Sequence, residues 1–296
     1  MRVFITGAAG FIGAATTREL IANGHEVLGL ARSDANAEAL KKIGADVHPG
    51  TLEDIEALKG GARNADGVIH CAFIHDFSTF FENGQVDKRA IEAMGEALEG
   101  TGKPFIVTSG TGLIAPGVTV TEDMRRDDST PMPRMSEQAG LAFASRGVRA
   151  MAMRLPQVHG GEGKAGLITY LVELARQKGA AAYVGEGTER WAAAHRGDVA
   201  RLYRLALEKG LAGTAYHAVG EEGVPMRDII EVVGRALDVP VVSITQAEAG
   251  AYYGPLSMFA GLDMPASSAL TRKWLDWNPT EIGLIADIGQ PGYFTA

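Results

Sequence analysis

The segment Thr6–Gly13, which reads "TGAAGFIG", decides how the N-terminal half of this sequence folds. It follows a short apolar run and precedes a helical pattern, so its three glycines lie in a turn between a strand and a helix. Gly7 allows the tight turn, Gly10 lets the backbone approach a pyrophosphate, and Gly13 allows the helix to pack closely on the strand. This arrangement predicts a dinucleotide site.

The helix that follows these glycines begins with Phe11 and Ile12. Amide groups in a first helical turn lack partners within the helix, and the macrodipole places positive charge there, so the pyrophosphate is expected at this point. The alternative is an ordinary turn that binds no ligand. The strand–turn–helix pattern, followed by another strand, favours the dinucleotide.

The end of the second predicted strand indicates which dinucleotide binds. It reads "VLGLARSD" (27–34), and Ala31 stands where an NAD enzyme usually has Asp or Glu for the ribose hydroxyls. The guanidinium of Arg32 can pair with a 2′-phosphate, and the Ser33 hydroxyl can add a hydrogen bond. We therefore predict NADP, with NAD as the second option. Alternatively, Arg32 is solvated and Asp34 binds the ribose, although we expect Asp34 to cap the next helix.

Short apolar strands alternate with helical stretches along the first half of the chain. This alternation is typical of a parallel sheet with helices on both faces. The expected strands are 2–7, 25–31, 46–50, 66–72, 103–110 and 148–156, and the expected helices are 11–24, 34–44, 52–60, 88–100 and 134–147, with a loop at 73–84.

From about residue 160 the pattern changes to more glycines, few strands and longer helices, expected at 166–179, 196–210 and 226–237. We therefore predict an α/β protein: a Rossmann-type doubly wound parallel sheet with a smaller helix-rich C-terminal substrate lobe. The predicted domains are 1–160, which binds NADP, and 161–296, which is interleaved with the last sheet strands. The lobe is expected over the carboxyl ends of the strands, where such sheets bind ligands.

Composition excludes several classes of function. The 296 residues have a net charge of −8, which argues against a nucleic-acid partner, and no apolar run is long enough to span a bilayer. Cys71 is the single cysteine, so no internal disulfide and no Cys-rich zinc site can form, and no metal is expected. The N-terminus lacks the features of a signal peptide. We expect a cytoplasmic protein with a small-molecule substrate and no membrane partner, and leave a homodimer open.

The chain resembles the short-chain dehydrogenase/reductase superfamily, in its extended or atypical, epimerase/dehydratase-like branch. The resemblance rests on "TGAAGFIG", "DGVIHCAF" (66–73), "FIVTSGTG" (105–112), "RGVRAMAMRLPQVHG" (146–160), "YVGEGTERWAAAHRGDVARLYRLALEKG" (183–210) and "LTRKWLDWNPT" (270–280). It implies that Thr51 and Leu52 lie near the adenine. It also implies that Cys71, Ala72 and Phe73 line the ribose and nicotinamide, with Thr108 and Ser109 beside the nicotinamide.

The catalytic pair of this superfamily is missing. Members that reduce carbonyls use a Tyr as general acid, with a Lys four residues later that lowers its pKa. The matching positions here are Thr130 and Arg134. No Tyr lies between Cys71 and Thr169, so no shift in the alignment restores the pair.

Four residues are candidate replacements. His75 can titrate near neutrality, and the neighbouring Asp76 could orient it or raise its pKa, although a solvated loop histidine is the competing interpretation. Ser109 or Thr111 could hold the substrate oxygen. Arg134 cannot release a proton and could act only electrostatically, or could be a plain surface arginine.

The favoured function is an NADP-dependent oxidoreductase that acts on a small carbonyl or alcohol by hydride transfer, with a non-standard proton donor. Two alternatives stay open. One is a dinucleotide-binding regulatory protein without turnover, and the other is a non-redox enzyme of the isomerase or epimerase type on the same fold.

Overall fold

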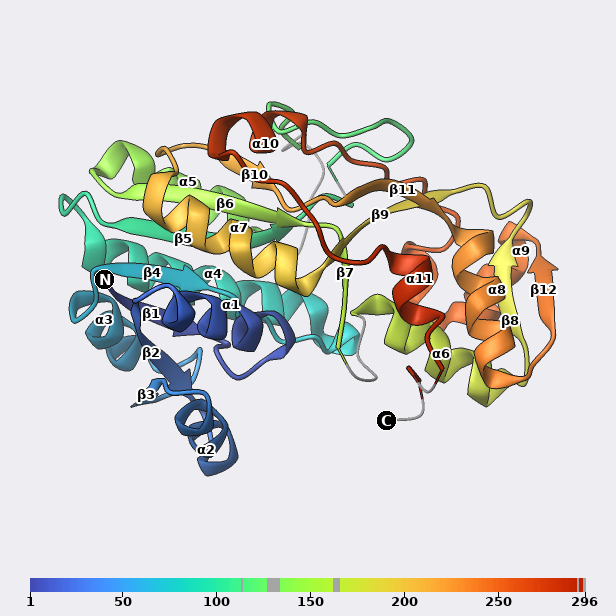
Figure 1. The fold of residues 1–296 in the computed structure, drawn as a ribbon, viewed down its shortest axis with the longest axis horizontal. Helices are drawn as coiled ribbons and strands as arrows, with labels where there is room; N and C mark the ends of the chain where they lie inside the picture. The colour runs from blue at the N-terminus through green and yellow to red at the C-terminus, as the bar shows by residue number, and fades with distance from the viewer. Residues whose placement is uncertain (113, 127–133, 162–165, 292, 295–296) are drawn as a thin grey trace.

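A seven-stranded parallel sheet forms the left half of the molecule in Figure 1, and a lobe of helices and short strands forms the right half. The computed structural model describes residues 1–112, 114–126, 134–161, 166–291 and 293–294. The strand order is β10-β6-β5-β4-β1-β2-β3. The strands are β1 (Arg2–Thr6), β2 (Glu26–Ala31), β3 (Asp46–Pro49), β4 (Gly67–His70), β5 (Pro104–Gly110), β6 (Arg149–Leu155) and β10 (Ala215–His217).

Helices cover both faces of this sheet, as predicted for a doubly wound fold. One face carries α1 (Phe11–Ala22), α2 (Asp34–Lys42) and α7 (Arg196–Lys209), and the other carries α3 (Ile55–Arg63), α4 (Phe80–Leu98) and α5 (Ser136–Leu141). The parallel strands are buried on both sides, which explains their continuous apolar sequences.

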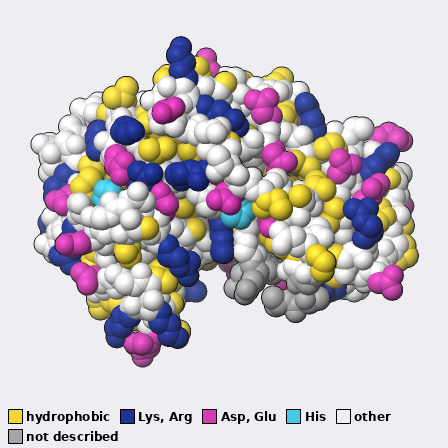
Figure 2. Space-filling model, in the orientation of Figure 1, with side chains coloured by type: hydrophobic (Ala, Val, Ile, Leu, Met, Phe, Trp, Pro, Cys, Tyr) yellow, Lys and Arg dark blue, Asp and Glu magenta, His cyan; other side chains and the backbone are white. Residues whose placement is uncertain are grey.

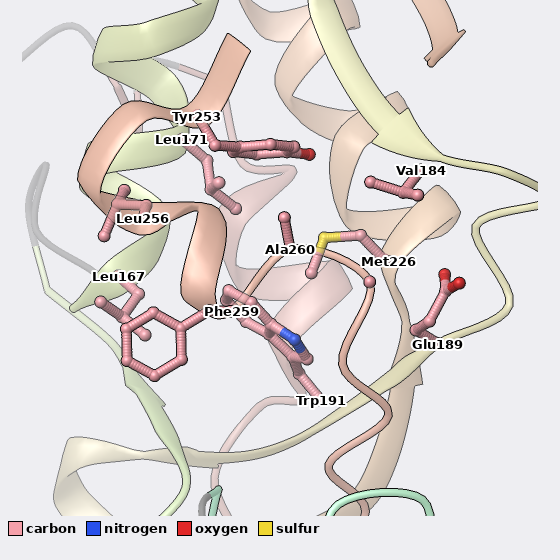
Figure 3. A pocket seen from close by; sticks show the side chains of 11 residues that line it. Leu167, Leu171, Val184, Glu189, Trp191, Met226, Tyr253, Leu256, Phe259 and Ala260 are labelled. Carbon is pink, nitrogen blue, oxygen red and sulfur yellow. The ribbon is translucent and has the colours of Figure 1, made fainter. Parts of the chain in front are cut away.

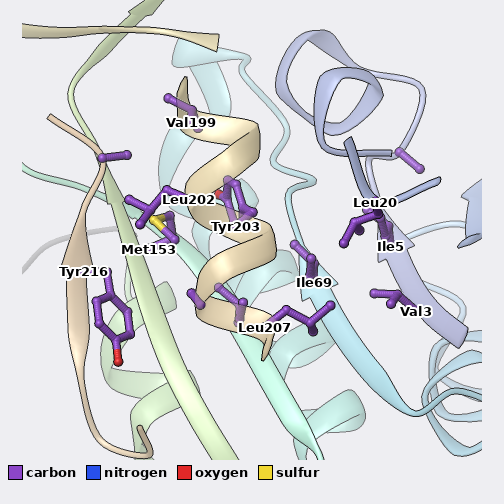
Figure 4. Packing of buried hydrophobic residues seen from close by; sticks show 14 of the residues in the cluster. Val3, Ile5, Leu20, Ile69, Met153, Val199, Leu202, Tyr203, Leu207 and Tyr216 are labelled. Carbon is purple, nitrogen blue, oxygen red and sulfur yellow. The ribbon is translucent and has the colours of Figure 1, made fainter. Parts of the chain in front are cut away.

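The core under α7 shows how the two halves of the sequence share one interior. In Figure 4, Leu202, Tyr203 and Leu207 of α7 lie beside Ile69 of β4 and Met153 of β6, and all five side chains are buried. This face of the sheet is therefore closed by a helix from the second half of the chain.

The lobe is built on two small sheets. Strands β7 (Gln157–His159), β9 (Arg190–His195) and β11 (Glu221–Pro225) form one, and β8 (Ala181–Val184) pairs with β12 (Val241–Ile244) in the other. Around them lie α6 (Leu167–Lys178), α8 (Met226–Leu237), α9 (Gln246–Tyr253), α11 (Leu284–Ile288) and the 3-10 helix η3 (Gly254–Met258), while α10 (Ala269–Leu275) returns to the sheet half.

The chain passes between the sheet and the lobe several times. It leaves β6 for β7 and returns from β9 into α7. After β10 it crosses again into β11, and it comes back once more to α10. The expectation of few strands after residue 160 was therefore wrong, because β8 to β12 all follow it. These strands have only three to six residues, too few for a clear pattern.

Two element boundaries also differ from the prediction. The loop expected at 73–84 ends early, because the Asp76 carboxylate accepts hydrogen bonds from the Ser78 amide (2.9 Å) and hydroxyl (2.6 Å) and caps η1 (Phe77–Thr79). Helix α4 then begins at residue 80. The helix expected at 134–147 is α5 followed by a 3-10 segment, η2 (Ala142–Arg146).

Candidate active site

The glycine turn between β1 and α1 has the shape that a bound phosphate requires. Gly7 has φ of +69°, and a Cβ there would lie 2.8 Å from the Ala72 nitrogen. A Cβ at Gly13 would lie 2.1 Å from the Gly7 oxygen. The loop's own packing thus requires both glycines. At Gly10, an added Cβ would meet only the Gly7 oxygen, at 3.1 Å, so the outer side of the turn is open.

The start of α1 offers uncapped amide groups to an anion. Gly10 is the N-cap residue and has no side chain that could accept from them, and the first turn contains no acidic residue. The amides of Phe11 and Ile12 therefore face the open side of the turn without a competing carboxylate. The residues present here fit the pyrophosphate of a dinucleotide.

The residues predicted to bind the dinucleotide lie in a row along the carboxyl edge of the sheet. In strand order they are Thr108 and Ser109 on β5, Cys71, Ala72 and Phe73 after β4, the glycine turn after β1, Arg32 and Ser33 after β2, and Thr51 and Leu52 after β3. Neighbouring strands lie about 4.8 Å apart, so this row spans about 19 Å. The chain reverses its strand order between β1 and β4, which is where such sheets bind ligands.

At the adenosine end of this row, Arg32 is exposed and makes no hydrogen bond or ion pair with another described residue. Ser33 is the N-cap of α2: its hydroxyl accepts from the Asn36 amide at 3.3 Å and donates to the Asn36 Oδ1 at 2.6 Å. The expectation that Asp34 is the cap was therefore wrong, because the extended backbone ends one residue earlier. The Ser33 hydroxyl is used by the helix, whereas the Arg32 guanidinium is available to a ligand.

Thr51 and Leu52 follow β3 at the edge of the sheet. Thr51 is exposed, and its hydroxyl accepts a hydrogen bond from the Glu53 amide at 3.2 Å. Leu52 is half-buried and packs against the core on the α3 side. The Gly50 amide donates to the Ala31 carbonyl at 3.0 Å, which holds this loop beside the end of β2.

Thr108 and Cys71 lie against α7. The Thr108 hydroxyl donates to the His70 carbonyl at 2.6 Å, so the Tyr203 hydroxyl, also 2.6 Å away, donates to Thr108. Burial raises the pKa of the Cys71 thiol to about 11, although hydrogen bonds with Thr108 and Tyr203 lower it. The thiol is therefore protonated at neutral pH, and the Thr108 hydroxyl is fully engaged within the protein.

Arg134 occupies the position matched to the missing Lys. One of its terminal nitrogens donates to the Thr108 carbonyl at 2.9 Å, and Nε donates to the Ser136 hydroxyl at 3.0 Å. The guanidinium lies 4.2 Å from the centre of the Phe73 ring. Burial lowers the pKa of Arg134, whereas the Asp87 carboxylate raises it. Thr130, matched to the missing Tyr, lies outside the described residues.

His75 completes the group that we call the Arg134 cluster: Phe73, His75, Thr108 and Arg134. The His75 and Phe73 rings pack edge to face with centroids 5.2 Å apart. Loss of hydration, followed by the charge of Arg134, lowers the pKa of His75. The expectation that Asp76 raises this pKa was wrong, because the Asp76 carboxylate caps η1 instead.

A buried polar chain supports the Arg134 cluster from below. The His70 Nδ1 lies 2.7 Å from the Thr6 hydroxyl, and its Nε2 lies 3.0 Å from Asp87 Oδ1. Ser136 accepts from Arg134 and donates to Asp87 Oδ2 at 2.6 Å. Burial raises the pKa of Asp87, but the hydrogen bond and charge of His70, then Arg134 and Ser136, hold it below its usual value.

No local pattern in the sequence indicates this buried polar chain. Asp87 lies in α4 and Ser136 in α5, and 49 positions separate them in the sequence. The residues located from sequence are those in local motifs at strand ends, such as the glycine turn, or at positions matched to the family, such as Arg134.

The two candidate hydroxyls at the end of β5 differ in access. Ser109 is half-buried, whereas Thr111 is 2 % exposed and its hydroxyl points to the Leu155 carbonyl at 3.5 Å. The Thr111 amide donates to the same carbonyl at 3.0 Å. Thr111 therefore serves the joint between β5 and β6, and Ser109 is the more accessible of the two hydroxyls.

A small apolar pocket lies in the lobe (Figure 3), with a cavity volume of about 20 Å³, enough for about one water molecule. The side chains are aromatic and aliphatic apart from one carboxylate. The lining residues are Leu167, Leu171, Val184, Glu189, Trp191, Met226, Tyr253, Leu256, Phe259, Ala260 and Gly261. The Tyr253 hydroxyl is not free, because it donates to the Ala182 carbonyl at 2.6 Å.

The pocket adjoins the end of β5 and the segment after His75. Gly112 packs against Met264, since an added Cβ would lie 2.9 Å from its sulfur, and Met264 forms a β-bridge with Trp191 of the pocket wall. On the other side, η1 contacts η3, which carries Leu256. The sheet half is therefore linked to the pocket wall at two points, from Gly112 through Met264 and from η1 through η3.

Within the described residues, no group of three or more His, Cys, Asp or Glu side chains is placed to hold a metal ion. None of the described helices is long and apolar enough to cross a membrane. On the face shown in Figure 2, Lys and Arg side chains are interspersed with Asp and Glu.

Known proteins share this architecture. The "Uncharacterized protein C2A9.02" of Schizosaccharomyces pombe is 45% identical over 295 residues, which cover 99% of this chain and 100% of that protein. The "2-alkyl-3-oxoalkanoate reductase" of Stenotrophomonas maltophilia is 27% identical over 82% of this chain and 77% of its own length. The crystal structure of DesIV, a dTDP-glucose 4,6-dehydratase from Streptomyces venezuelae with NAD and TYD bound, covers 98% of this chain and 95% of that one, with a TM-score of 0.77 and 18% identity.

The structural likeness to DesIV shows the fold alone, because its sequence identity is low. The family assignment comes from the sequence model described as "NAD dependent epimerase/dehydratase family", which matches residues 3–219. This range contains the glycine turn, the Arg134 cluster and α7. The chain therefore belongs to the NAD-dependent epimerase/dehydratase family.

Proposed function

We propose that this protein is an NADP-dependent oxidoreductase that interconverts a small, largely apolar carbonyl compound and its alcohol. The observation that carries the proposal is the placement of Arg134. Its guanidinium is fixed at the carboxyl end of β5 by the Thr108 carbonyl and Ser136, where the family's reductases would have their lysine.

Arg134 would act by stabilising charge. The dinucleotide, when bound, supplies or accepts the hydride. A carbonyl that gains a hydride develops negative charge on its oxygen, and a preorganised guanidinium in a partly desolvated site stabilises that charge. Ser109 follows Thr108 on β5, and its half-buried hydroxyl can donate a hydrogen bond to the oxygen. Arg134 keeps its proton throughout, so the proton must come from another group.

His75 is the titratable side chain in the Arg134 cluster that could carry this proton. Its lowered pKa makes the imidazole neutral at pH 7, so it can accept a proton from an alcohol. Donation to a product alkoxide requires the protonated ring, which becomes populated only as the pH falls below 7. The ring keeps an exposed edge, so it can exchange protons with water.

The substrate class follows from the apolar pocket. Its walls include Trp191, Phe259 and Met226, and its lining contains no Lys or Arg that could bind the phosphates of a sugar nucleotide. The chemistry of this lining suits an alkyl or aryl chain, and the side chains would have to move apart to admit one. The name of the Stenotrophomonas maltophilia relative, a reductase of alkylated 3-oxoalkanoates, is consistent with this class.

The preference for NADP rests on Arg32, which is exposed, unpaired among the described residues and next to the adenosine end of the row. A charge-assisted hydrogen bond to the 2′-phosphate contributes about 1.5–3 kcal/mol. Replacing Arg32 with Ala should therefore weaken NADP binding about 10- to 100-fold and leave NAD binding unchanged.

The test measures NADPH oxidation with medium-chain ketones, aldehydes and 3-oxo esters as substrates. Separate assays with dTDP-glucose and UDP-glucuronic acid test the sugar-nucleotide alternative. The wild type should turn over at least one apolar carbonyl, and Arg134→Ala should lower kcat about 100- to 1000-fold, because one charge-stabilising donor is lost. The control is Arg89→Ala, an exposed residue of α4 outside the cluster. Tight NADPH binding without turnover on any substrate would point to the regulatory alternative. Conversion of a sugar nucleotide would point to the epimerase-type alternative.

A further inference from the structure

Arg196, the first residue of α7, lies beside the start of α1 although 185 positions separate it from Phe11 in the sequence. Its guanidinium carbon is 5.4 Å from the centre of the Phe11 ring. A Cβ at Gly161 would lie 2.2 Å from the same carbon, so the absence of a side chain at Gly161 makes room for the guanidinium. The half-buried Arg196 side chain is thus held between a ring and a glycine, next to the glycine turn.

The other two arginines of α7 pair with carboxylates, whereas Arg196 has no such partner in the part of the chain that the structure describes. Arg201 bonds to Asp198, and Arg204 bonds to Glu19 and Glu208. Among the described residues, Arg196 has no hydrogen bond or ion pair. It also stands in the first turn of its own helix, where the macrodipole disfavours a cation. An unpaired, half-buried cation at that place is costly unless an anion binds in front of it.

We propose that Arg196 binds the pyrophosphate of the dinucleotide, which would lie between its guanidinium and the first amides of α1. The uncapped amides of Phe11 and Ile12, the macrodipole of α1 and the Arg196 guanidinium all favour negative charge in the same place. This inference rests on the proposed dinucleotide binding and deepens it. It assigns to the joint between β9 and α7 a direct part in holding the cofactor.

The proposal separates two arginines by the phosphate that each recognises. Arg32 would contact the 2′-phosphate, which NADP has and NAD lacks. Arg196 would contact the pyrophosphate, which both dinucleotides have. Loss of Arg196 should therefore weaken both by the same factor, whereas loss of Arg32 should weaken NADP alone.

The test is calorimetry with three probes: NADP⁺, NAD⁺ and adenosine 2′-monophosphate, which has the 2′-phosphate but no pyrophosphate. Arg196→Ala should raise Kd about 10- to 100-fold for both dinucleotides and leave the mononucleotide unaffected. Arg32→Ala should raise Kd for NADP⁺ and for the mononucleotide only. Arg89→Ala, which removes the same charge at an exposed site on α4, should change none of the three.

A stability measurement separates ligand binding from a structural role. Without ligand, Arg196→Ala should have a Tm equal to or above that of the wild type, because it removes an unfavourable cation from the start of α7. With saturating NADP⁺, the variant should gain less in Tm than the wild type. A lower Tm without ligand together with unchanged Kd values would show that Arg196 is structural and would overturn the proposal.

A second route to the same result displaces Arg196 without removing it. The Cβ in Gly161→Ala would occupy the place of the guanidinium, so binding should weaken, and the double variant with Arg196→Ala should bind no worse than Arg196→Ala alone. Additive losses would contradict a shared mechanism. If the wild type itself binds none of the dinucleotides, the proposed function fails; if it binds and Arg196→Ala binds equally well, only this inference fails.

Discussion

Asp87 is the single residue on which the geometry of the Arg134 cluster depends most. Its two carboxylate oxygens accept hydrogen bonds from His70 and from Ser136, and the side chain is buried. Ser136 in turn fixes Arg134. A substitution of the buried Asp87 should therefore change the position of the Arg134 guanidinium.

Replacing Asp87 with Asn should lower the free energy of unfolding by about 3–5 kcal/mol. The amide NH2 of Asn would face a donor of His70 or Ser136, and the buried charge of Arg134 would lose the nearby carboxylate. Urea unfolding at pH 7 measures this. Asp46→Asn, which breaks the exposed pair with Arg2, should change stability by less than about 1 kcal/mol.

The Asp87 effect should also depend on pH. The pKa of this carboxyl is lowered in the folded protein, so its contribution is present above the unfolded-state pKa of about 3.9 and is lost as the pH falls through the folded value. The difference in free energy of unfolding between the wild type and Asp87→Asn should therefore be smaller at pH 3 than at pH 7. An equal difference at both pH values would show that Asp87 does not titrate as inferred.

His75 makes a second prediction at this scale, on the pH dependence of the rate. Because its pKa lies below the usual value of 6.5, carbonyl reduction should accelerate as the pH falls from 7.5 toward that pKa, while alcohol oxidation should slow. Steady-state kcat in both directions gives the profiles. His75→Asn should remove both slopes, and unchanged profiles in that variant would exclude His75 as the proton carrier.

At the scale of elements, the contact between α1 and the glycine turn is the tightest constraint. A Cβ at Gly13 would meet the Gly7 carbonyl at 2.1 Å, and backbone cannot move aside as a side chain can. Gly13→Ala should cost about 1–3 kcal/mol of stability, measured by thermal or urea unfolding, and should weaken dinucleotide binding.

Gly250 is the matched control for this change. It lies within α9, and an added Cβ there would meet no atom within 4 Å. Gly250→Ala should therefore stabilise the protein by about 0.5–1 kcal/mol, since alanine loses less backbone freedom on folding. Equal effects at both positions would mean that close packing is not what Gly13 provides.

The strands and helices of the sheet half could be predicted because their apolar runs and glycine turn are local signals. In the lobe, the helices α6 and α8 were predicted, but the strands were not, because a strand such as β8, with four residues, shows no period and depends on pairing with β12. The same reasoning covers the site. Arg32 and Gly13 follow from local motifs, whereas the hydrogen bond between Tyr203 and Thr108 joins residues 95 positions apart.

At the scale of the molecule, the predicted boundary near residue 160 is not a place where the chain can be cut. A fragment of residues 1–160 lacks α7 and β10, so one face of the sheet would expose Ile69 and Met153 to water. We expect this fragment to lack a cooperative thermal transition and to bind a hydrophobic dye, while the full chain unfolds cooperatively. A stable, dinucleotide-binding fragment would contradict the shared core.

The repeated passage of the chain between sheet and lobe has a further consequence for motion. A lobe attached by one linker can rotate on a hinge. This lobe is connected to the sheet half by four segments: β6–β7, β9–α7, β10–β11 and the segment that leads to α10. These connections together resist rotation of the lobe, because a large rotation would strain the backbone at several of them. We therefore expect a ligand to enter and leave through small displacements of surface segments, while the two halves keep their mutual orientation.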